Sequence, residues 1–139
     1  MTPLYAQNHD FGAFNVLAVD DIPLNLLLVQ KMLARYNFKL RTASGGQQAL
    51  DAVAAQKPHL ILLDLMMPGI DGFEVIRRLR GNPDTADIRI VILSALNSKE
   101  DVIRGFNEGA DDYIMKPIIM EKLLSCVVTQ LQIVESQSR

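Results

Sequence analysis

The sequence predicts an α/β protein built on an open parallel sheet with helices on both faces. Two observations support this prediction. Short apolar runs alternate with longer segments of helical period along the chain. One of these runs, Leu60–Leu63, is apolar without interruption, which is typical of a strand buried on both faces of a parallel sheet. The chain has 139 residues, so we expect one domain with a self-sufficient core.

The expected strands are short apolar runs that end at a polar residue or at a turn signal. In chain order they cover Asn15–Val19, Phe38–Thr42, Leu60–Leu63, Ile88–Leu93 and Tyr113–Met115. Each is followed by a longer segment, and the strict alternation of strand and helix argues against an antiparallel sheet.

The expected helices carry apolar side chains at helical spacing. Pro23 suits the first turn of the first helix, and Ser98 with Asp101 resembles a capping box at the start of the fourth. We expect helices from Pro23 to about Tyr36, from Gly46 to Lys57, from Phe73 to Gly81, from Ser98 to Gly109 and over Leu123–Val134.

The composition argues against several classes of protein. The formal net charge is -2, which does not suit a basic nucleic-acid footprint. The N-terminus lacks the pattern of a secretory signal, and no apolar run is long enough to span a membrane. One cysteine excludes an internal disulfide. We therefore expect a cytoplasmic protein without direct nucleic-acid or membrane contact.

Polar side chains follow four of the five expected strands. Asp20 and Asp21 follow the first strand, Asp64 the third, Ser94 the fourth and Lys116 the fifth. Because the carboxyl ends of parallel strands share one edge of the sheet, where ligands bind, we expect these side chains to lie close together. A chance distribution of surface charge would place them along helix faces instead.

Three neighbouring carboxylates repel one another unless cations compensate them. Hard oxygen ligands suit Mg²⁺, with Mn²⁺ as a substitute, and Lys116 adds a further positive charge. Metal coordination sites, a lysine and a hydroxyl are the groups that hold a transferring phosphoryl group. A carboxylate is also a competent nucleophile that forms an aspartyl-phosphate.

Four motifs, in this order, carry a family resemblance: VDD (19–21), LLDLMMPGIDG (62–72), ILSA (92–95) and GADDYIMKP (109–117). Together they resemble the receiver domain of bacterial two-component response regulators. The resemblance implies a flavodoxin-like (βα)5 three-layer sandwich whose five-stranded parallel sheet has the order 2-1-3-4-5. It covers residues 15–135, which leaves 1–14 as an N-terminal leader. Residues 136–139 would form a C-terminal tail, or the start of a linker helix.

The resemblance also implies roles at the carboxylates. Asp64 is expected to be the phosphoacceptor. Asp21 and Asp64 would bind Mg²⁺ directly, Asp20 would act largely through bound water, and the backbone carbonyl of Met66 would complete the protein ligands.

Further roles are implied around these carboxylates. Lys116 would pair with Asp64 and then with the phosphoryl oxygens, which Ser94 and the backbone N–H of Ala95 would also contact. Ser94 and Tyr113 would form the switch. The Lys116-Pro117 peptide bond is expected to be cis.

The implied function is phosphoryl transfer in signalling. A phosphohistidine of a sensor histidine kinase, or of a histidine phosphotransfer protein, would donate to Asp64 with the help of Mg²⁺. The surface formed by the fourth helix, fifth strand and fifth helix would then change, to control a downstream output domain or protein. A phosphorylation-driven homodimer is a further expected partner. The chain would not be an enzyme in the ordinary sense, although it would catalyse its own phosphotransfer and slow dephosphorylation.

Met66 and Leu96 lie two residues after Asp64 and Ser94, at positions that tend to vary in this family and to tune hydrolysis. Both side chains are bulky and apolar, and we hypothesise that they restrict the attacking water and prolong the phosphorylated state. One alternative is a phosphorylation-independent pseudo-receiver, an interaction module that keeps the fold only. Another is an aspartyl-phosphate hydrolase of the haloacid-dehalogenase type. That mechanism needs a second acid where this chain has Met66.

Overall fold

The structure, a computed structural model, describes residues 10–137 as one alternating series of strands and helices. The strands are β1 (Asn15–Val19), β2 (Lys39–Ala43), β3 (Leu60–Leu63), β4 (Arg89–Ser94) and β5 (Asp112–Met115). The helices are α1 (Pro23–Leu33), α2 (Gly46–Ala55), α3 (Gly72–Arg80), α4 (Lys99–Glu108) and α5 (Met120–Gln137).

The strands form one parallel sheet of order β2-β1-β3-β4-β5. This is the order that the resemblance implied, and the flavodoxin-like fold is therefore confirmed. The register pairs Val19 with Leu63, the last residues of β1 and β3. The residues that directly follow these two strands, Asp20 and Asp64, are consequently neighbours at the same edge of the sheet.

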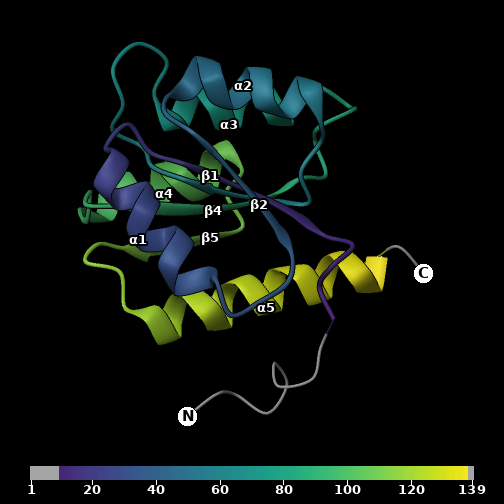
Figure 1. The fold of residues 1–139 in the computed structure, drawn as a ribbon. Coiled ribbons are helices and arrows are strands. Elements are labelled where there is room, and N and C mark those ends of the chain that lie inside the picture. The colour runs from purple at the N-terminus through teal and green to yellow at the C-terminus, as the bar shows by residue number, and fades with distance from the viewer. Residues whose placement is uncertain (1–9, 138–139) are drawn as a thin grey trace.

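Helices cover both faces of the sheet. In Figure 1, α2 and α3 lie above the sheet and α5 lies below it. Helix α1 packs on the same face as α5. Each face has its own apolar core. The core against α1 and α5 includes Val29, Leu62 and Val127, and the core against α2 and α3 includes Val53, Ile61 and Ile76. All four residues of β3 are fully buried, because this central strand faces both cores, as its uninterrupted apolar sequence predicted.

Two helix starts follow from local chemistry. Asp71 caps α3, since its side chain accepts a hydrogen bond from the backbone N–H of Glu74. Ser98 caps α4 in the same way, with Asp101 N–H as the donor, and this confirms the expected cap. Gly109 ends α4 with a φ of 120°, a conformation that favours glycine.

The observed elements differ from the expected ones mainly at their ends. β2 and β4 begin and end one residue later than expected, and α1 ends at Leu33 rather than near Tyr36. Phe38, expected in a strand, precedes β2 and packs into the core against α1 and α5. α5 continues to Gln137, past the boundary at residue 135 that the sequence suggested.

The expected leader and tail lie partly outside the described residues, which exclude 1–9 and 138–139. Within the described part, Phe11 and Phe14 are buried in the core beside α1 and α5. The Phe14 and His59 rings also meet in a T-shaped contact, with 5.1 Å between the ring centroids. These two residues of the expected leader therefore pack as part of the domain. No helix within residues 10–137 is long and apolar enough to cross a membrane.

Candidate functional site

The carboxyl ends of the strands gather the polar residues that the sequence analysis selected. Asp20 directly follows β1, Asp64 follows β3, Ser94 ends β4 and Lys116 follows β5. Asp20 and Asp64 are each only 6% exposed, and Ser94 is fully buried. Buried polar groups of this kind require partners, because their desolvation is otherwise uncompensated.

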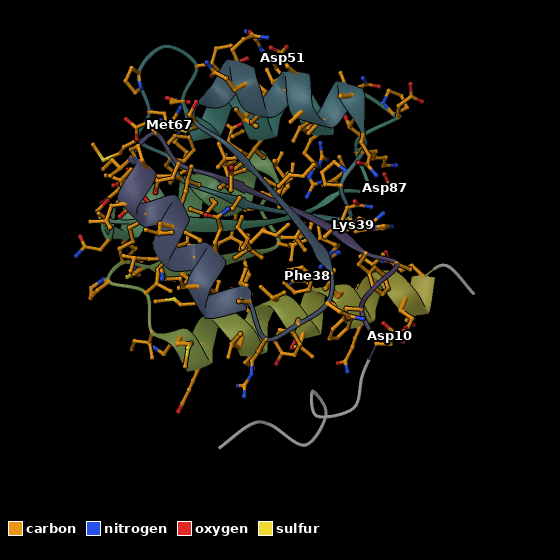
Figure 2. The ribbon with its side chains drawn as sticks, viewed as in Figure 1. Asp10, Phe38, Lys39, Asp51, Met67 and Asp87 are labelled. Atoms are coloured by element: carbon orange, nitrogen blue, oxygen red, sulfur yellow. The ribbon has the colours of Figure 1, made fainter. Side chains whose placement is uncertain are left out.

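Figure 2 identifies the two edges of the sheet. Met67, in the loop after β3, lies on the left, at the edge where the strands end. Lys39, the first residue of β2, and Asp87, shortly before β4, lie on the right, at the opposite edge. The candidate site is at the Met67 edge.

Three carboxylates form the centre of the site. One oxygen from each of Asp20, Asp21 and Asp64 lies within 4.8 Å of the other two. Among residues 10–137, Lys116 is the cation that contacts this group, so three negative charges face one positive charge there. The imbalance and the hard oxygen donors fit a divalent cation such as Mg²⁺.

Lys116 bridges two of the carboxylates. Its Nζ lies 2.8 Å from Asp20 Oδ2 and 3.7 Å from Asp64 Oδ2. The resemblance implied a pair with Asp64, whereas the closer partner in the structure is Asp20. The lysine is therefore hydrogen-bonded to one aspartate while it remains within electrostatic reach of the other.

Asp64 lies in an environment that disfavours its charge. Burial raises the pKa of the Asp64 carboxyl; the Lys116 ammonium opposes this shift, and the Asp20 carboxylate adds to it. Asp64 Oδ1 accepts a hydrogen bond from the backbone N–H of Leu65 at 2.8 Å. The carboxylate is thus fixed in direction but incompletely compensated in charge.

The backbone around Asp64 explains part of the local sequence. A Cβ atom on Gly72 would lie 2.4 Å from the backbone oxygen of Asp64, so only glycine allows α3 to begin this close to the aspartate. Gly69 has a φ of 74° in the turn between them. The Met66 side chain is 60% exposed beside Asp64, and Leu96 is half-buried.

Asp20 is held by residues of the segment that follows it. Its Oδ1 accepts from the backbone N–H of Ile22 at 2.9 Å, and its Oδ2 accepts from Asn25 Nδ2 at 3.1 Å. Asn25 is a residue of the site that was not predicted from the sequence. The available signal was its position in the first turn of the expected helix, five residues after Asp20, where a side chain can reach back toward the strand end.

A chain of hydrogen bonds links Ser94 to Tyr113. The backbone N–H of Leu96 donates to Ser94 Oγ at 3.1 Å, and the Tyr113 hydroxyl donates to the Leu96 carbonyl at 2.5 Å. Burial raises the pKa of the Tyr113 hydroxyl. Ala95 lies exposed between Ser94 and Leu96. The tyrosine is therefore connected, through one short loop, to the hydroxyl at the end of β4.

The peptide bond between Lys116 and Pro117 is cis, the isomer that the resemblance led us to expect. Lys116 N–H donates to the Ser94 carbonyl at 2.8 Å, which continues the pairing of β4 and β5 to the edge of the site. The structure therefore brings together Asp20, Asp21, Asp64, Ser94 and Lys116 at one end of the sheet, with Tyr113 connected behind them.

Comparison with known proteins gives a consistent result. A sequence model of the response regulator receiver domain matches residues 16–128. The chain is 43% identical over 103 residues to the response regulator PleD of Caulobacter vibrioides, an alignment that covers 74% of this chain and 23% of PleD. Among solved structures, the signal receiver domain of a histidine kinase from Syntrophus aciditrophicus is similar with a TM-score of 0.80 and 31% identity, over 86% of this chain and 90% of that one.

A further relative is relevant to the question of whether nucleic acid is a binding partner of this chain. The chain is 40% identical over 112 residues to RpaA of Synechocystis, described as a DNA-binding dual master transcriptional regulator, and the match covers 81% of this chain and 46% of RpaA. The chain thus spans less than half the length of PleD and of RpaA. Because RpaA is a DNA-binding regulator, the expectation that this chain makes no direct nucleic-acid contact is not supported.

Proposed function

The chain belongs to the response regulator receiver domain family, and on that premise we propose that Asp64 accepts a phosphoryl group from a phosphohistidine in a Mg²⁺-dependent reaction. The observation that carries this proposal is the position of Asp64. It is a buried carboxylate at a strand end, next to two further carboxylates and within 3.7 Å of the ammonium of Lys116. Such a carboxylate is a positioned nucleophile in a site that compensates charge.

In the proposed reaction, a bond forms between an Asp64 carboxylate oxygen and phosphorus while the bond from phosphorus to the imidazole nitrogen of the donor breaks. The donor leaves as a neutral imidazole after it takes a proton from solvent. Asp20, Asp21, Asp64 and the Met66 carbonyl would hold Mg²⁺, which supplies positive charge for the phosphoryl oxygens when it is bound.

The chain's own residues supply the remaining contacts. Lys116 would turn from Asp20 toward a phosphoryl oxygen, since its ammonium already lies between the two aspartates. Ser94 Oγ and the backbone N–H of Ala95 would hydrogen-bond the other phosphoryl oxygens. These contacts exist only in the phosphorylated state and therefore stabilise it selectively.

We infer that the hydrogen-bond chain from Ser94 to Tyr113 carries the signal away from Asp64. A change in Ser94 alters the loop that includes Leu96, and that loop holds the Tyr113 hydroxyl. Tyr113 lies in β5, next to α4 and α5. The surface of α4, β5 and α5 is thus the proposed output surface, which would bind an output domain, a partner protein or a second phosphorylated copy.

The proposed donors are a sensor histidine kinase or a histidine phosphotransfer protein. The proposed chemistry is self-phosphorylation from such a donor and slow loss of the phosphoryl group, rather than turnover of a separate substrate. Met66 and Leu96 flank the acceptor with apolar side chains, and we propose that they slow the attack of water on the aspartyl-phosphate.

Intact-mass spectrometry tests the proposed function. Wild-type protein and Asp64→Asn are incubated with acetyl phosphate, with Mg²⁺ or with EDTA. We expect one added phosphoryl group in the wild type with Mg²⁺, and none with EDTA or in Asp64→Asn. A folded wild type that gains no phosphoryl group from acetyl phosphate or from a phosphohistidine donor would contradict the proposal, and would favour an interaction module that keeps the fold only.

A further inference from the structure

Asn25 occupies a position at the site that the proposed chemistry does not yet use. It lies in the first turn of α1 (Pro23–Leu33), and its backbone N–H donates to the Ile22 carbonyl at 3.0 Å. Its side chain does not cap the helix. Instead, Nδ2 donates to Asp20 Oδ2 at 3.1 Å. The side chain therefore acts on the carboxylate, and the helix fixes the backbone from which it reaches.

The two carboxylate oxygens of Asp20 accept different numbers of hydrogen bonds. Oδ2 accepts from both Asn25 Nδ2 and Lys116 Nζ, whereas Oδ1 accepts from the backbone N–H of Ile22. A carboxylate oxygen accepts about two hydrogen bonds. Oδ2 is therefore fully used by protein donors, and Oδ1 retains the capacity to bind a cation.

The surroundings of Asp20 give its side chain room to turn. A cavity of about 300 Å³, lined in part by Asp20, Asn25 and Lys116, lies between α1 and the segment after β5. The rest of its lining is mostly apolar, for example Val29, and offers the carboxylate few alternative donors. A carboxylate beside open space keeps its direction only through the donors that bind it.

We propose that Asn25 is a positioning residue that holds Asp20 in place for the metal ion, and that it becomes the main side-chain partner of Asp20 when Lys116 moves to the phosphoryl group. This inference rests on the Mg²⁺ site of the proposed function. In the structure, Lys116 and Asn25 share Asp20 Oδ2. In the phosphorylated state Asn25 would hold that oxygen without the lysine.

The test is Mg²⁺ affinity, measured without phosphorylation by a titration with MgCl₂ that follows the backbone amide signals of Ile22 and Leu65 by NMR. Asn25→Ala removes the donor, and Asn25→Leu removes it while it keeps a side chain of similar size. We expect both variants to weaken Mg²⁺ binding about tenfold, as is typical when a residue that orients a metal ligand is lost.

Leu24→Ala is the matched control, because Leu24 is the neighbouring residue of the same helix and is 61% exposed. It should leave the Mg²⁺ affinity unchanged. Urea unfolding of all variants in EDTA measures helix stability separately. Unchanged Mg²⁺ affinity in both Asn25 variants would overturn the proposal, as would an equal loss of affinity in Leu24→Ala.

The second half of the proposal is tested by repeating the titration with beryllium fluoride, a phosphoryl mimic. The loss of Mg²⁺ affinity in the Asn25 variants should then be larger than without the mimic, because Lys116 no longer supports Asp20. An equal or smaller loss, or failure of the wild type to bind the mimic, would overturn this half. Phosphoryl incorporation into the wild type is scored independently by mass spectrometry. The proposed function can thus fail while the role of Asn25 in Mg²⁺ binding stands.

Discussion

Both ends of the sheet hold charged side chains that are at least partly shielded from solvent, but the two ends differ in how far these charges are compensated. At the end where the strands begin, Arg80, Arg89, Asp111 and Gln130 form a cluster that we call the arginine cluster. Arg80 donates to the carbonyls of Ala86, Ile88 and Gly109 and to Asp111 Oδ2. Arg89 donates to Gln130 Oε1 at 2.7 Å, and its Nη2 lies 3.4 Å from Asp111 Oδ1.

At the opposite end, Asp20, Asp21 and Asp64 face one lysine. Here the three negative charges exceed the single positive charge that the described residues place beside them. The arginine cluster uses half-buried, paired charges to join α3, β4, α5 and the segment before β5. The carboxylate site instead leaves charge uncompensated and so retains affinity for a cation. This difference indicates that the degree to which side-chain charges are compensated, rather than their burial alone, distinguishes a structural cluster from a binding site.

The largest expected effect on stability comes from breaking the arginine cluster. Asp111→Ala removes the acceptor for Arg80 and for the backbone N–H of Ile90, and leaves Arg80 and Arg89 without their carboxylate. We expect the free energy of unfolding to fall by about 3 kcal/mol, measured by urea unfolding.

Asp87→Ala is the control for this prediction. Asp87 lies at the same end of the sheet and pairs with Lys57 at 2.7 Å, but both side chains are exposed. Its loss should lower the free energy of unfolding by less than ~1 kcal/mol. Equal losses in Asp111→Ala and Asp87→Ala would mean that the arginine cluster has no special structural role.

A change at Met66, beside the carboxylate site, should alter chemistry without altering stability. Met66 is largely exposed, so Met66→Asn should leave the fold intact, but it places a polar group where water would approach the aspartyl-phosphate. We expect the phosphorylated protein to lose its phosphoryl group about tenfold faster, a difference of about 1.4 kcal/mol in the barrier. Intact-mass measurements over time after removal of the donor give the rate, and an unchanged lifetime would refute the role of Met66.

The smallest expected effect is on the free energy of unfolding when the uncompensated charge of Asp64 is removed. Burial raises the pKa of Asp64, so its carboxylate is less favourable in the folded than in the unfolded chain at neutral pH. In EDTA, Asp64→Asn should therefore raise the free energy of unfolding by about 1 kcal/mol at pH 7.

The sign of the pH dependence follows from the same shift. As the pH falls through the raised pKa of Asp64 toward the ordinary value of 3.8, the wild type becomes protonated and its penalty disappears. The advantage of Asp64→Asn should then vanish at low pH, as measured by urea unfolding across the pH range. A variant less stable than the wild type at pH 7 in EDTA would show that the carboxylate is fully compensated after all.

The sequence predicted one end of the sheet much better than the other. Strand ends are set by apolar runs, and the parallel topology then brings Asp20, Asp64, Ser94 and Lys116 to one edge whatever their rotamers. The arginine cluster was not predicted, because Arg80 and Asp111 are 31 residues apart and nothing local marks them as partners. The individual side-chain contacts of the site were not predictable from the sequence for a related reason. Whether Lys116 lies closer to Asp20 or to Asp64 depends on side-chain conformations.

The most direct test of the central claim is to locate the phosphoryl group itself. Wild-type protein is phosphorylated with acetyl phosphate and Mg²⁺, and then treated with borohydride, which reduces an aspartyl-phosphate to homoserine. Peptide sequencing by mass spectrometry then identifies the modified residue. The account predicts homoserine at position 64 and unmodified aspartate at positions 20 and 21. Homoserine at another aspartate, or at none while the intact protein carries a phosphoryl group, would contradict it.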